Sequence, residues 1–446
     1  MINEKLAKRI FDEALAASSA DETLVMVTGG KSALTRFCNN YIHQNVMQKD
    51  YTVTVVTAFG KQVGVASSNL FDRGELERIV DVASTVAKRQ KEDPMWEPLS
   101  EQLDYRPPEN TYDEATIEKD HGEKAEMVRQ MISPCKSAQC KTAGALTNGD
   151  NLVAVATSHG LFAYHCWTSA DLTLTVETED GASGWSEACA NRLSDIDIKL
   201  LTARALEKAQ LARNPITLEP GKYNVILEPP ATATLLRYMS VVGFGGLAFN
   251  EGRSFLSGKM GEKVMGDNIT IRDDFNAGAR KGFPFDFEGF PRKAVTIIDK
   301  GVAKGVVHSR RTAAKAQTEN TGHALPYPSI YGPIPLNVHL EGGNVSREDQ
   351  LKSLDNGLLL TRTWYESIVD PKLPSITGMS RDGTYLVENG EIKAAIKNIR
   401  FNEDMRDLFC RTESLSKEVE TTKGWGAIVT APAILVKDFN ITGQTK

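Results

Sequence analysis

The sequence predicts an α+β protein with two parts. The first part combines helices with an antiparallel sheet, and the second part is rich in strands and long loops. Three observations lead to this prediction. Helical apolar spacing occurs mainly before residue 214, strand-like alternation occurs in both parts, and Pro215 follows the last helical segment of the first part. We therefore expect an N-terminal α/β domain at residues 1–214 and a C-terminal β-rich domain at residues 215–446.

The chain begins with a predicted helix and a predicted strand. Apolar residues recur at helical spacing within residues 4–17. Residues 23–27 are mostly apolar and β-branched, which is typical of a strand. We expect this strand to end at Gly29 and Gly30, because glycines often mark the end of a regular element.

A β-hairpin and a second helix follow. Residues 52–56 and 62–66 alternate as strands do, so we expect a hairpin that turns near Gly60. Asp72 is a good N-cap for the apolar helical pattern that comes after it. Residues 93–112 contain four prolines and predict a loop that crosses the surface.

The rest of the first part predicts a helix, a meander of antiparallel strands and another helix. The helices are expected at about residues 121–133 and 196–212. Strand-like alternation fills residues 141–190 between them. Turn-forming residues at 148–150 and 158–160 are expected to connect the strands.

The second part opens with a strand at residues 223–227 and a helix at about residues 231–242. Strand-like segments then alternate with long loops, and such loops usually line sites or contact partners. The predicted strands lie at residues 295–298, 302–307, 358–360, 385–387 and 433–439.

Composition excludes several classes of protein. The formal net charge is −6, so we do not expect nucleic acid as a partner. No run of 18 apolar residues predicts a membrane span, and the N-terminus lacks the apolar stretch of a signal peptide. The six cysteines are scattered, which favours reduced thiols. We therefore expect a cytoplasmic protein.

Five segments, in order, carry a resemblance to a known family. They are Thr35-Arg36-Phe37, the glycine-rich run at 258–262, Asn320-Thr321-Gly322 with a proline-rich loop after it, Ser375-Ile376-Thr377-Gly378, and the strand at 432–436. Together they resemble the TldD/PmbA family, also called TldD/TldE, over almost the whole chain. The order and spacing of the set are more specific than any one segment.

The resemblance implies a cytoplasmic dimer that encloses a cleft and receives an unfolded peptide as an extended strand. Backbone hydrogen bonds hold such a strand whatever its side chains are. The family contains a metalloprotease subunit with H-E-x-x-x-H on the helix that opens the second part, and a late cysteine ligand. It also contains a partner subunit without the metal. Some members have been described as modulators of DNA gyrase.

The helix that matches the metal-binding helix lacks metal ligands here. Aligned on the paired leucines, the three positions are Arg237, Tyr238 and Val242. Aligned on a downstream Phe-Asn pair, they are Tyr238, Met239 and Gly243. Neither alignment supplies a histidine or a carboxylate, which zinc sites require. The resemblance therefore implies no catalytic residue, no metal and no cofactor in this chain, as in the PmbA/TldE-type subunit.

The late cysteine is missing as well, because no cysteine follows Cys410. We expect the chain to be inactive alone, with a TldD-like subunit or a second copy as partner. Arg237 either binds a peptide carboxylate or carbonyl or pairs with a local acid such as Glu228. Tyr238, Arg310, Thr321, Gly322 and His323 are the other candidates for binding peptide in the cleft.

Two alternative functions remain open from the sequence. An autonomous metallopeptidase would need a metal site of another kind, for which His308, His323 and His339 are the candidates. A peptide- or protein-binding module of the gyrase-modulator type would need no peptidase partner. The preferred hypothesis is a non-catalytic subunit of a TldD/TldE-type metalloprotease that acts on unfolded peptides.

Overall fold

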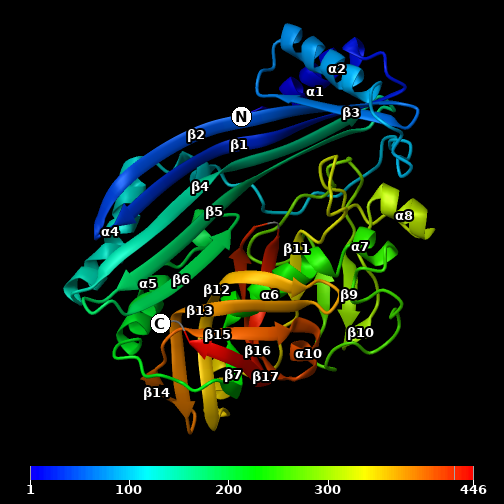
Figure 1. The fold of residues 1–446 in the computed structure, drawn as a ribbon. Coiled ribbons are helices and arrows are strands. Elements are labelled where there is room, and N and C mark those ends of the chain that lie inside the picture. Colours follow the sequence, from blue (N-terminus) through cyan, green and yellow to red (C-terminus); the bar gives the residue numbers. More distant parts are fainter. Residues whose placement is uncertain (1, 426, 445–446) are drawn as a thin grey trace.

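The computed structural model describes residues 2–425 and 427–444 and arranges them around two sheets. Figure 1 shows a long arched sheet, formed by the first part of the chain, above a more compact second sheet. The α+β class and the β-rich second part are confirmed. The segment between Ala212 and Gly221 connects the two sheets, and the predicted domain boundary at residue 214 falls within it.

The first sheet has the order β3-β2-β1-β4-β5-β6, and all neighbouring strands are antiparallel. The hairpin predicted near Gly60 is the β2–β3 connection. The strand bounds are β1 (Glu22–Cys38), β2 (Tyr41–Phe59), β3 (Gln62–Ser68), β4 (Lys141–Thr157), β5 (Phe162–Glu177) and β6 (Ser183–Ala190).

Two predictions for this sheet are wrong for one physical reason. The first strand does not end at Gly29 and Gly30, and residues 148–150 do not form a turn, because β1 and β4 run straight through these positions. A Cβ added to Gly30 would lie 2.0 Å from the Asp150 carbonyl oxygen, and one added to Gly149 would lie 1.9 Å from that of Lys31. The glycines are therefore needed where neighbouring strands approach closely in the bent sheet.

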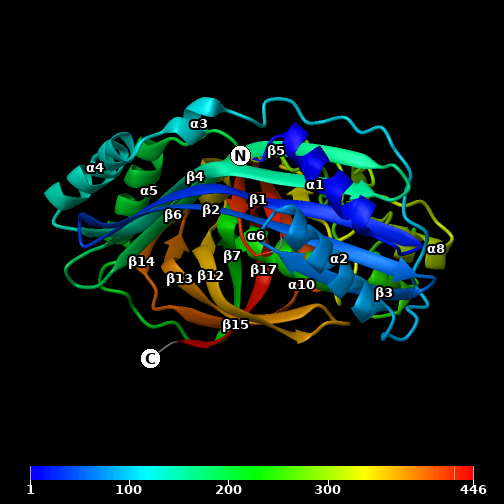
Figure 2. The ribbon, with the colours of Figure 1, turned by 90° about the horizontal axis from the view of Figure 1, so that it is seen from above.

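Helices cover one face of the first sheet at both ends (Figure 2). Asp72 caps α2 by accepting a hydrogen bond from the Glu75 amide, as predicted, and Asp120 and Glu123 form a capping box at the start of α4. The first pair of helices packs over β1, β2, β3 and β4, and the second pair packs over β4, β5 and β6. Their bounds, with one short helix between the pairs, are α1 (Glu4–Ala17), α2 (Arg73–Ala87), α3 (Glu114–Glu118), α4 (His121–Ser137) and α5 (Ile198–Leu211).

The opposite face of the first sheet turns toward the second part of the chain. Alternate side chains of β1, Leu24 and Met26, pack with Trp96 and Leu99 of the predicted loop and with Phe285 from the second part. Both faces are buried at this end, which explains the nearly continuous apolar run of the first strand. The loop at residues 93–112 thus joins the two parts.

The second sheet contains a closed ring. β7 pairs with both β12 and β17, and the path β17-β15-β13-β12-β7 therefore returns to its start. The remaining strands extend from β17 and β13. The bounds are β7 (Gly221–Leu227), β8 (Ile271–Asp273), β9 (Val295–Asp299), β10 (Val302–Ala303), β11 (Asn337–Leu340), β12 (Asn356–Asp370), β13 (Ser375–Glu388), β14 (Glu391–Ala395), β15 (Ile399–Asp404), β16 (Thr412–Lys423) and β17 (Ile428–Gln444).

The helix predicted at residues 231–242 packs into the core formed with β7, β12 and β17. It is α6 (Pro229–Val242), and Leu235, Leu236 and Met239 are buried there. In the described residues, no helix combines the length and the apolar character that a bilayer crossing requires. The other helices of the second part are α7 (Gly246–Asn250), α8 (Arg310–Ala316), α9 (Arg347–Lys352) and α10 (Met405–Cys410).

One edge of the first sheet is only partly covered. β3 pairs with residues 53–59 of β2, and residues 41–52 of β2 pair with β1 alone among the described strands. Residues 43–50 of this stretch are all exposed.

Candidate functional site

The candidate site is built around α6, which follows β7 directly. Pro229 and Pro230 occupy its first turn, where the missing amide hydrogens cost nothing. The helix rises from the closed ring toward the space beneath the first sheet, with β16 alongside. It thus carries Arg237 and Tyr238 beside β16 and the segment that follows it.

Arg237 is a buried cation on α6, with only 8% of its surface exposed. Its Nη2 donates a hydrogen bond to Thr422 Oγ1 at 3.2 Å, whereas its buried Nε has no acceptor among the described residues. A Cβ on Gly424 would lie 2.2 Å from the guanidinium carbon, so only glycine leaves room for this side chain. Burial lowers the pKa of Arg237, and the charges of Glu187 and Glu366 oppose that shift.

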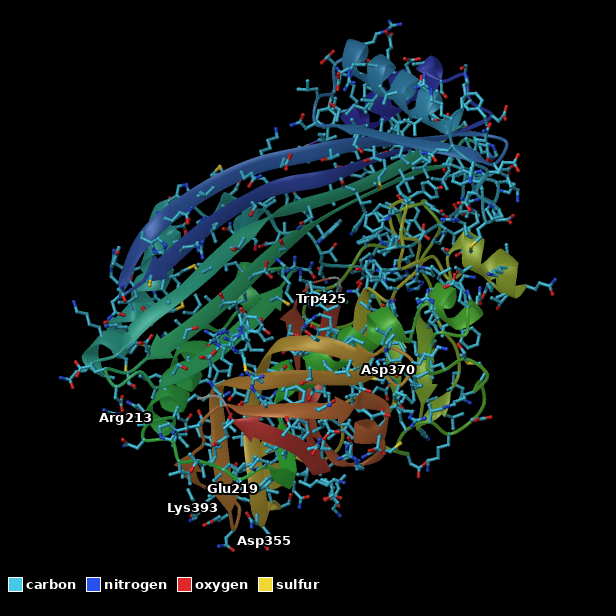
Figure 3. All side chains as sticks on the ribbon, in the orientation of Figure 1. Arg213, Glu219, Asp355, Asp370, Lys393 and Trp425 are labelled. Atoms are coloured by element: carbon cyan, nitrogen blue, oxygen red, sulfur yellow. The ribbon has the colours of Figure 1, made fainter. Side chains whose placement is uncertain are left out.

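Tyr238 fixes the next position of the helix. Its hydroxyl donates a hydrogen bond to the Glu366 carbonyl oxygen at 2.8 Å. Its ring meets that of Trp425 edge-on, with 5.1 Å between centroids. Figure 3 places Trp425 between the two sheets, and 53% of this residue is exposed. Val242 is half-buried.

The two alternative positions, Met239 and Gly243, are both buried. A Cβ on Gly243 would lie 2.2 Å from the Phe255 ring. In either alignment, the residues at the predicted metal positions offer no imidazole and no carboxylate. These residues do not fit a metal ion.

Glu187, on β6 of the first sheet, is the functional candidate that the sequence did not indicate. Burial raises the pKa of its carboxyl group to about 7, although the Arg237 and Arg362 charges pull it down. β6 packs against β16 and β13, which brings this carboxylate near α6. No local pattern in the sequence indicates a contact between segments 50 residues apart.

The suggested pairing of Arg237 with Glu228 is wrong. Glu228 lies at the start of α6 and forms an ion pair with Lys208, with 2.5 Å between Oε2 and Nζ. Both side chains are largely buried. No carboxylate lies within 4 Å of the Arg237 nitrogens in the described part of the chain. The acids whose charges act on Arg237 are instead Glu187 and Glu366, and its role in binding an outside group stays a prediction.

His323 lies in a fully buried cluster. Its Nε2 is 2.7 Å from Asp273 Oδ2 and its Nδ1 is 2.9 Å from Thr321 Oγ1, so both ring nitrogens are engaged. Arg292 forms an ion pair of 2.6 Å with the same carboxylate, and both side chains are completely buried. Burial raises the pKa of Asp273, but the Arg292 and His323 charges outweigh it and hold the pKa well below its usual range. His323 therefore serves the packing of the second part.

Thr321 and Gly322 belong to the same structural unit. Thr321 Oγ1 accepts a hydrogen bond from the His308 amide at 2.7 Å and donates to the His308 carbonyl oxygen at 3.0 Å. Gly322 has φ of 72°, and a Cβ there would lie 2.2 Å from the Pro291 carbonyl oxygen. Both residues hold the loop in shape.

Arg310 connects the two parts of the chain. It pairs with Glu288 at 3.3 Å, donates to the Pro98 carbonyl oxygen at 2.8 Å, and lies over the Trp96 ring at 5.2 Å. None of its contacts within the described residues involves α6. The six predicted site residues thus fall into three places: Arg237 with Tyr238, Thr321 and Gly322 with His323, and Arg310 alone.

The three histidines proposed for another kind of metal site do not form one. His308 Nδ1 lies 3.3 Å from Thr312 Oγ1, and His339 lies on β11 beside β17. Across residues 2–425 and 427–444, no three His, Cys, Asp or Glu side chains are grouped so that they would hold a metal ion.

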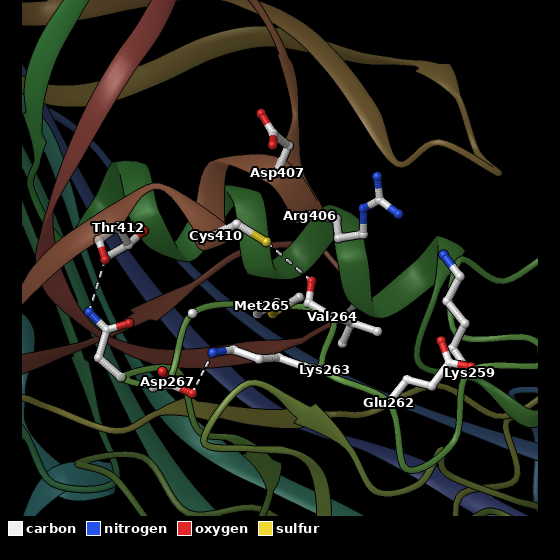
Figure 4. Close-up of a pocket in the computed structure, with 12 residues that line it drawn as sticks. Lys259, Glu262, Lys263, Val264, Met265, Asp267, Arg406, Asp407, Cys410 and Thr412 are labelled. Atoms are coloured by element: carbon white, nitrogen blue, oxygen red, sulfur yellow. Dashed lines mark hydrogen bonds and ion pairs between the residues drawn. The ribbon is translucent and has the colours of Figure 1, made fainter.

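Two cavities differ in their relation to α6. Figure 4 shows a cavity of about 720 Å³ between the segment at 259–268 and α10, where the Cys410 thiol donates to the Val264 carbonyl oxygen at 3.4 Å. None of the predicted site residues lines it. A second cavity, of about 450 Å³, has walls from both parts of the chain and includes Gly424, the residue that packs on Arg237.

The two-sheet fold, with a helix packed in the closed ring of the second sheet, defines a protein with the architecture of the TldD/PmbA peptidases. In this chain the helix carries no metal ligands. Family models described as the PmbA/TldA metallopeptidase central domain and C-terminal domain match residues 114–213 and 220–443. The chain therefore belongs to the TldD/PmbA family, and the resemblance predicted from the sequence is confirmed.

Individual relatives cover different shares of the chain. Metalloprotease PmbA of Escherichia coli O157:H7 is 23% identical over 462 residues, which cover 99% of this chain and 96% of that protein. A metalloprotease of Methanocaldococcus jannaschii is 27% identical over 229 residues, and the match spans about half the length of each protein.

Solved structures share the fold at low sequence identity. TldE from Thermococcus kodakarensis has a TM-score of 0.87, with 22% identity and 99% of each chain covered. A Thermotoga maritima protein described as a candidate modulator of a DNA gyrase has a TM-score of 0.85, with 22% identity, and covers 98% of this chain.

Proposed function

We propose that this chain is a non-catalytic subunit of a TldD/TldE-type cytoplasmic peptidase and helps to bind unfolded peptides. The observation that carries the proposal is Arg237, a buried guanidinium on the helix where the metalloprotease subunits of the family hold their metal. A guanidinium keeps its proton at any physiological pH, so it repels a metal cation at that place.

The same guanidinium suits a different task. Its buried Nε has no acceptor among the described residues, and the exposed Trp425 lies against the neighbouring Tyr238, so a peptide carbonyl or carboxylate is proposed to bind beside them. Charge-assisted hydrogen bonds to such groups are the stronger kind. Arg237 is thus proposed to bind the peptide at the position where a metalloprotease subunit of the family would hold its metal ion.

The partner is proposed to be a TldD-like metalloprotease subunit, with a second copy of this chain as the alternative. The open edge of β2 at residues 41–52 supports association, because unpaired strand edges take up further strands. The names of the relatives, PmbA and TldE, also support a peptidase role. Residues 1–214 and 215–446 are proposed as the domains that enclose the cleft.

The proposal is tested by reconstitution. The purified chain is incubated with an unfolded polypeptide, alone and with a TldD-like subunit from the same genome, and degradation is followed by electrophoresis. We expect no cleavage by the chain alone and a gain when both are present, lost when the partner's glutamate in H-E-x-x-x-H is changed to glutamine. Arg237→Ala should reduce the gain, whereas Arg253→Ala, an exposed arginine paired with Glu251, should not.

Two other outcomes would replace the proposal. Hydrolysis by the chain alone, with stoichiometric metal after dialysis, would establish an autonomous metallopeptidase. Stable binding to another protein such as DNA gyrase, with no effect on a TldD-like subunit, would establish a binding module.

A further inference from the structure

The cavity of about 450 Å³ beside α6 lies where both parts of the chain meet. Trp167 on β5 stacks on Phe283 with 5.4 Å between centroids, and Phe283 meets Phe287 edge-on at 5.3 Å. Leu325 and Leu336 complete an apolar wall. Its volume falls within the range of about 300–1,000 Å³ that is usual for small-ligand pockets. One large side chain fits such a space.

Basic side chains line the same cavity on one side. Arg280 and Lys423 both pair with Asp171, which places them next to each other. Lys281 follows Arg280 in the chain, and its Nζ donates to the Glu109 carbonyl oxygen. No described carboxylate lies within 4 Å of that Nζ. Two of these three cations thus share one carboxylate, and the third has none.

A fourth cation lies behind the wall. Gly424 lines the cavity, and the Arg237 guanidinium packs directly on it. Arg237 is more than nine-tenths buried, and its Nε has no acceptor among the described residues. The excess of positive charge favours an anionic group on the ligand.

We propose that this cavity binds the C-terminal residue of a peptide, with a large apolar side chain against Trp167 and Phe283 and the terminal carboxylate toward Lys281 and its neighbouring cations. The inference rests on the proposed function as a peptide-binding subunit. A single chamber with apolar walls and cations beside them suits one residue that carries both an apolar group and a carboxylate. Only a C-terminal residue combines an apolar side chain with a carboxylate one bond from its Cα.

The experiment compares three peptides of identical unfolded sequence, ending in phenylalanine acid, phenylalanine amide or serine acid. Binding is measured by isothermal titration calorimetry to the chain alone and to its complex with a TldD-like subunit inactivated at its glutamate. We expect the phenylalanine acid to bind at least about tenfold more tightly than either other peptide, a difference expected for loss of a charge-assisted hydrogen bond or of a large apolar group. Raising the salt concentration should reduce the preference for the acid over the amide.

Two variants separate the contributions of the cavity. Lys281→Gln should abolish the preference for acid over amide and leave binding of the amide unchanged. Phe287→Ala should abolish the preference for phenylalanine over serine. Lys259→Gln, at a lysine that lines the other cavity, is the matched control and should change neither preference.

Equal affinity for the acid and the amide would overturn this inference and leave the peptide-binding subunit intact. Failure of every peptide to bind, both to the chain and to the complex, would overturn the proposed function as well. A preference that persists in Lys281→Gln would also contradict the assignment, because the carboxylate would then lie elsewhere.

Discussion

Arg237 and Arg292 are both buried arginines of the second part, but their surroundings differ. Arg292 forms a fully buried ion pair with Asp273, and its guanidinium lies between the Phe275 and Phe283 rings at 5.5 and 5.6 Å. Arg237 has one hydrogen bond to a threonine and no carboxylate within 4 Å in the described residues. Removing one partner of a buried ion pair strongly destabilises a fold, whereas a buried charge without a partner needs another reason to be there.

The same contrast holds for the groups around them. Asp273 accepts hydrogen bonds from the Leu336 and Asn337 amides at 2.9 and 2.7 Å in addition to its two charged partners. Glu187, near Arg237, has a pKa raised by burial to about 7. Perturbed carboxyl groups beside a cavity are typical of functional sites. The comparison indicates a structural role for the Arg292 cluster, and it supports the binding role proposed for the Arg237 site.

The largest expected effect is that of Arg292→Met. The substitution leaves the Asp273 carboxylate buried without its main counter-charge, so we expect the free energy of unfolding to fall by about 3–5 kcal/mol. Urea denaturation followed by circular dichroism measures it. Lys304→Met, at an exposed pair with Asp299, should change stability by less than about 0.5 kcal/mol. A similar change in the free energy of unfolding for both variants would contradict a structural role for the Arg292 cluster.

An intermediate effect is expected from Glu187→Gln as a function of pH. The folded pKa of Glu187 is about 7 and lies above its ordinary value of 4.5. The folded state therefore binds the proton more tightly, so this group's contribution is complete below about pH 4.5 and is lost as the pH rises through 7. Relative to the glutamine variant, the native protein should lose up to about 3 kcal/mol between these values.

The pH measurement is made as a difference between the two proteins. Asp286, whose pKa is also raised to about 7 by burial and by Glu288, is present in both and cancels. Denaturant titrations at pH 5, 6, 7 and 8 are sufficient. A difference that stays constant with pH would show that Glu187 is well solvated and would weaken the Arg237 site.

The smallest expected effect on stability is that of Arg237→Met. Methionine fills the space of the aliphatic part of the Arg237 side chain. Because Glu187 remains protonated at pH 6, no buried charge is left without a partner. The free energy of unfolding should therefore change by less than about 1 kcal/mol. Peptide binding should nevertheless weaken in the calorimetric assay. A loss of stability as large as that of Arg292→Met would mean that Arg237 is paired as firmly as Arg292, and the comparison would fail.

Local patterns predicted much of the fold. The helix at α6, the hairpin at Gly60 and the Asp72 cap depend on neighbours within a few residues, which the sequence displays directly. The role of the glycines in β1 and β4 could not be predicted, because it depends on strands more than 100 residues apart in the sequence. Their spacing along the chain resembles a turn, and only the sheet register shows the close approach.

The candidate site was predicted in part for the same reason. Arg237 and Tyr238 could be placed on α6 by helical spacing, but Glu187 and Gly424 come from other elements that only tertiary contacts bring to them. His323 is predicted to bind peptide; in the structure its side chain is fully buried and its ring nitrogens lie beside Asp273 and Thr321. A sequence shows the chemistry of a side chain, but it does not show which of its polar atoms already form hydrogen bonds or ion pairs within the fold.

The open edge of β2 has a consequence for how the chain behaves without a partner. A strand edge of 12 residues offers backbone amides and carbonyls to any extended segment, including those of other copies. The side chains along it are mostly polar, and Lys49 and Asp50 add opposite charges that discourage flat pairing. The amide hydrogens of residues 41–52 that point away from β1 should therefore exchange with deuterium much sooner than those of the closed ring, and this contrast in exchange rates would shrink once a partner strand covers the edge.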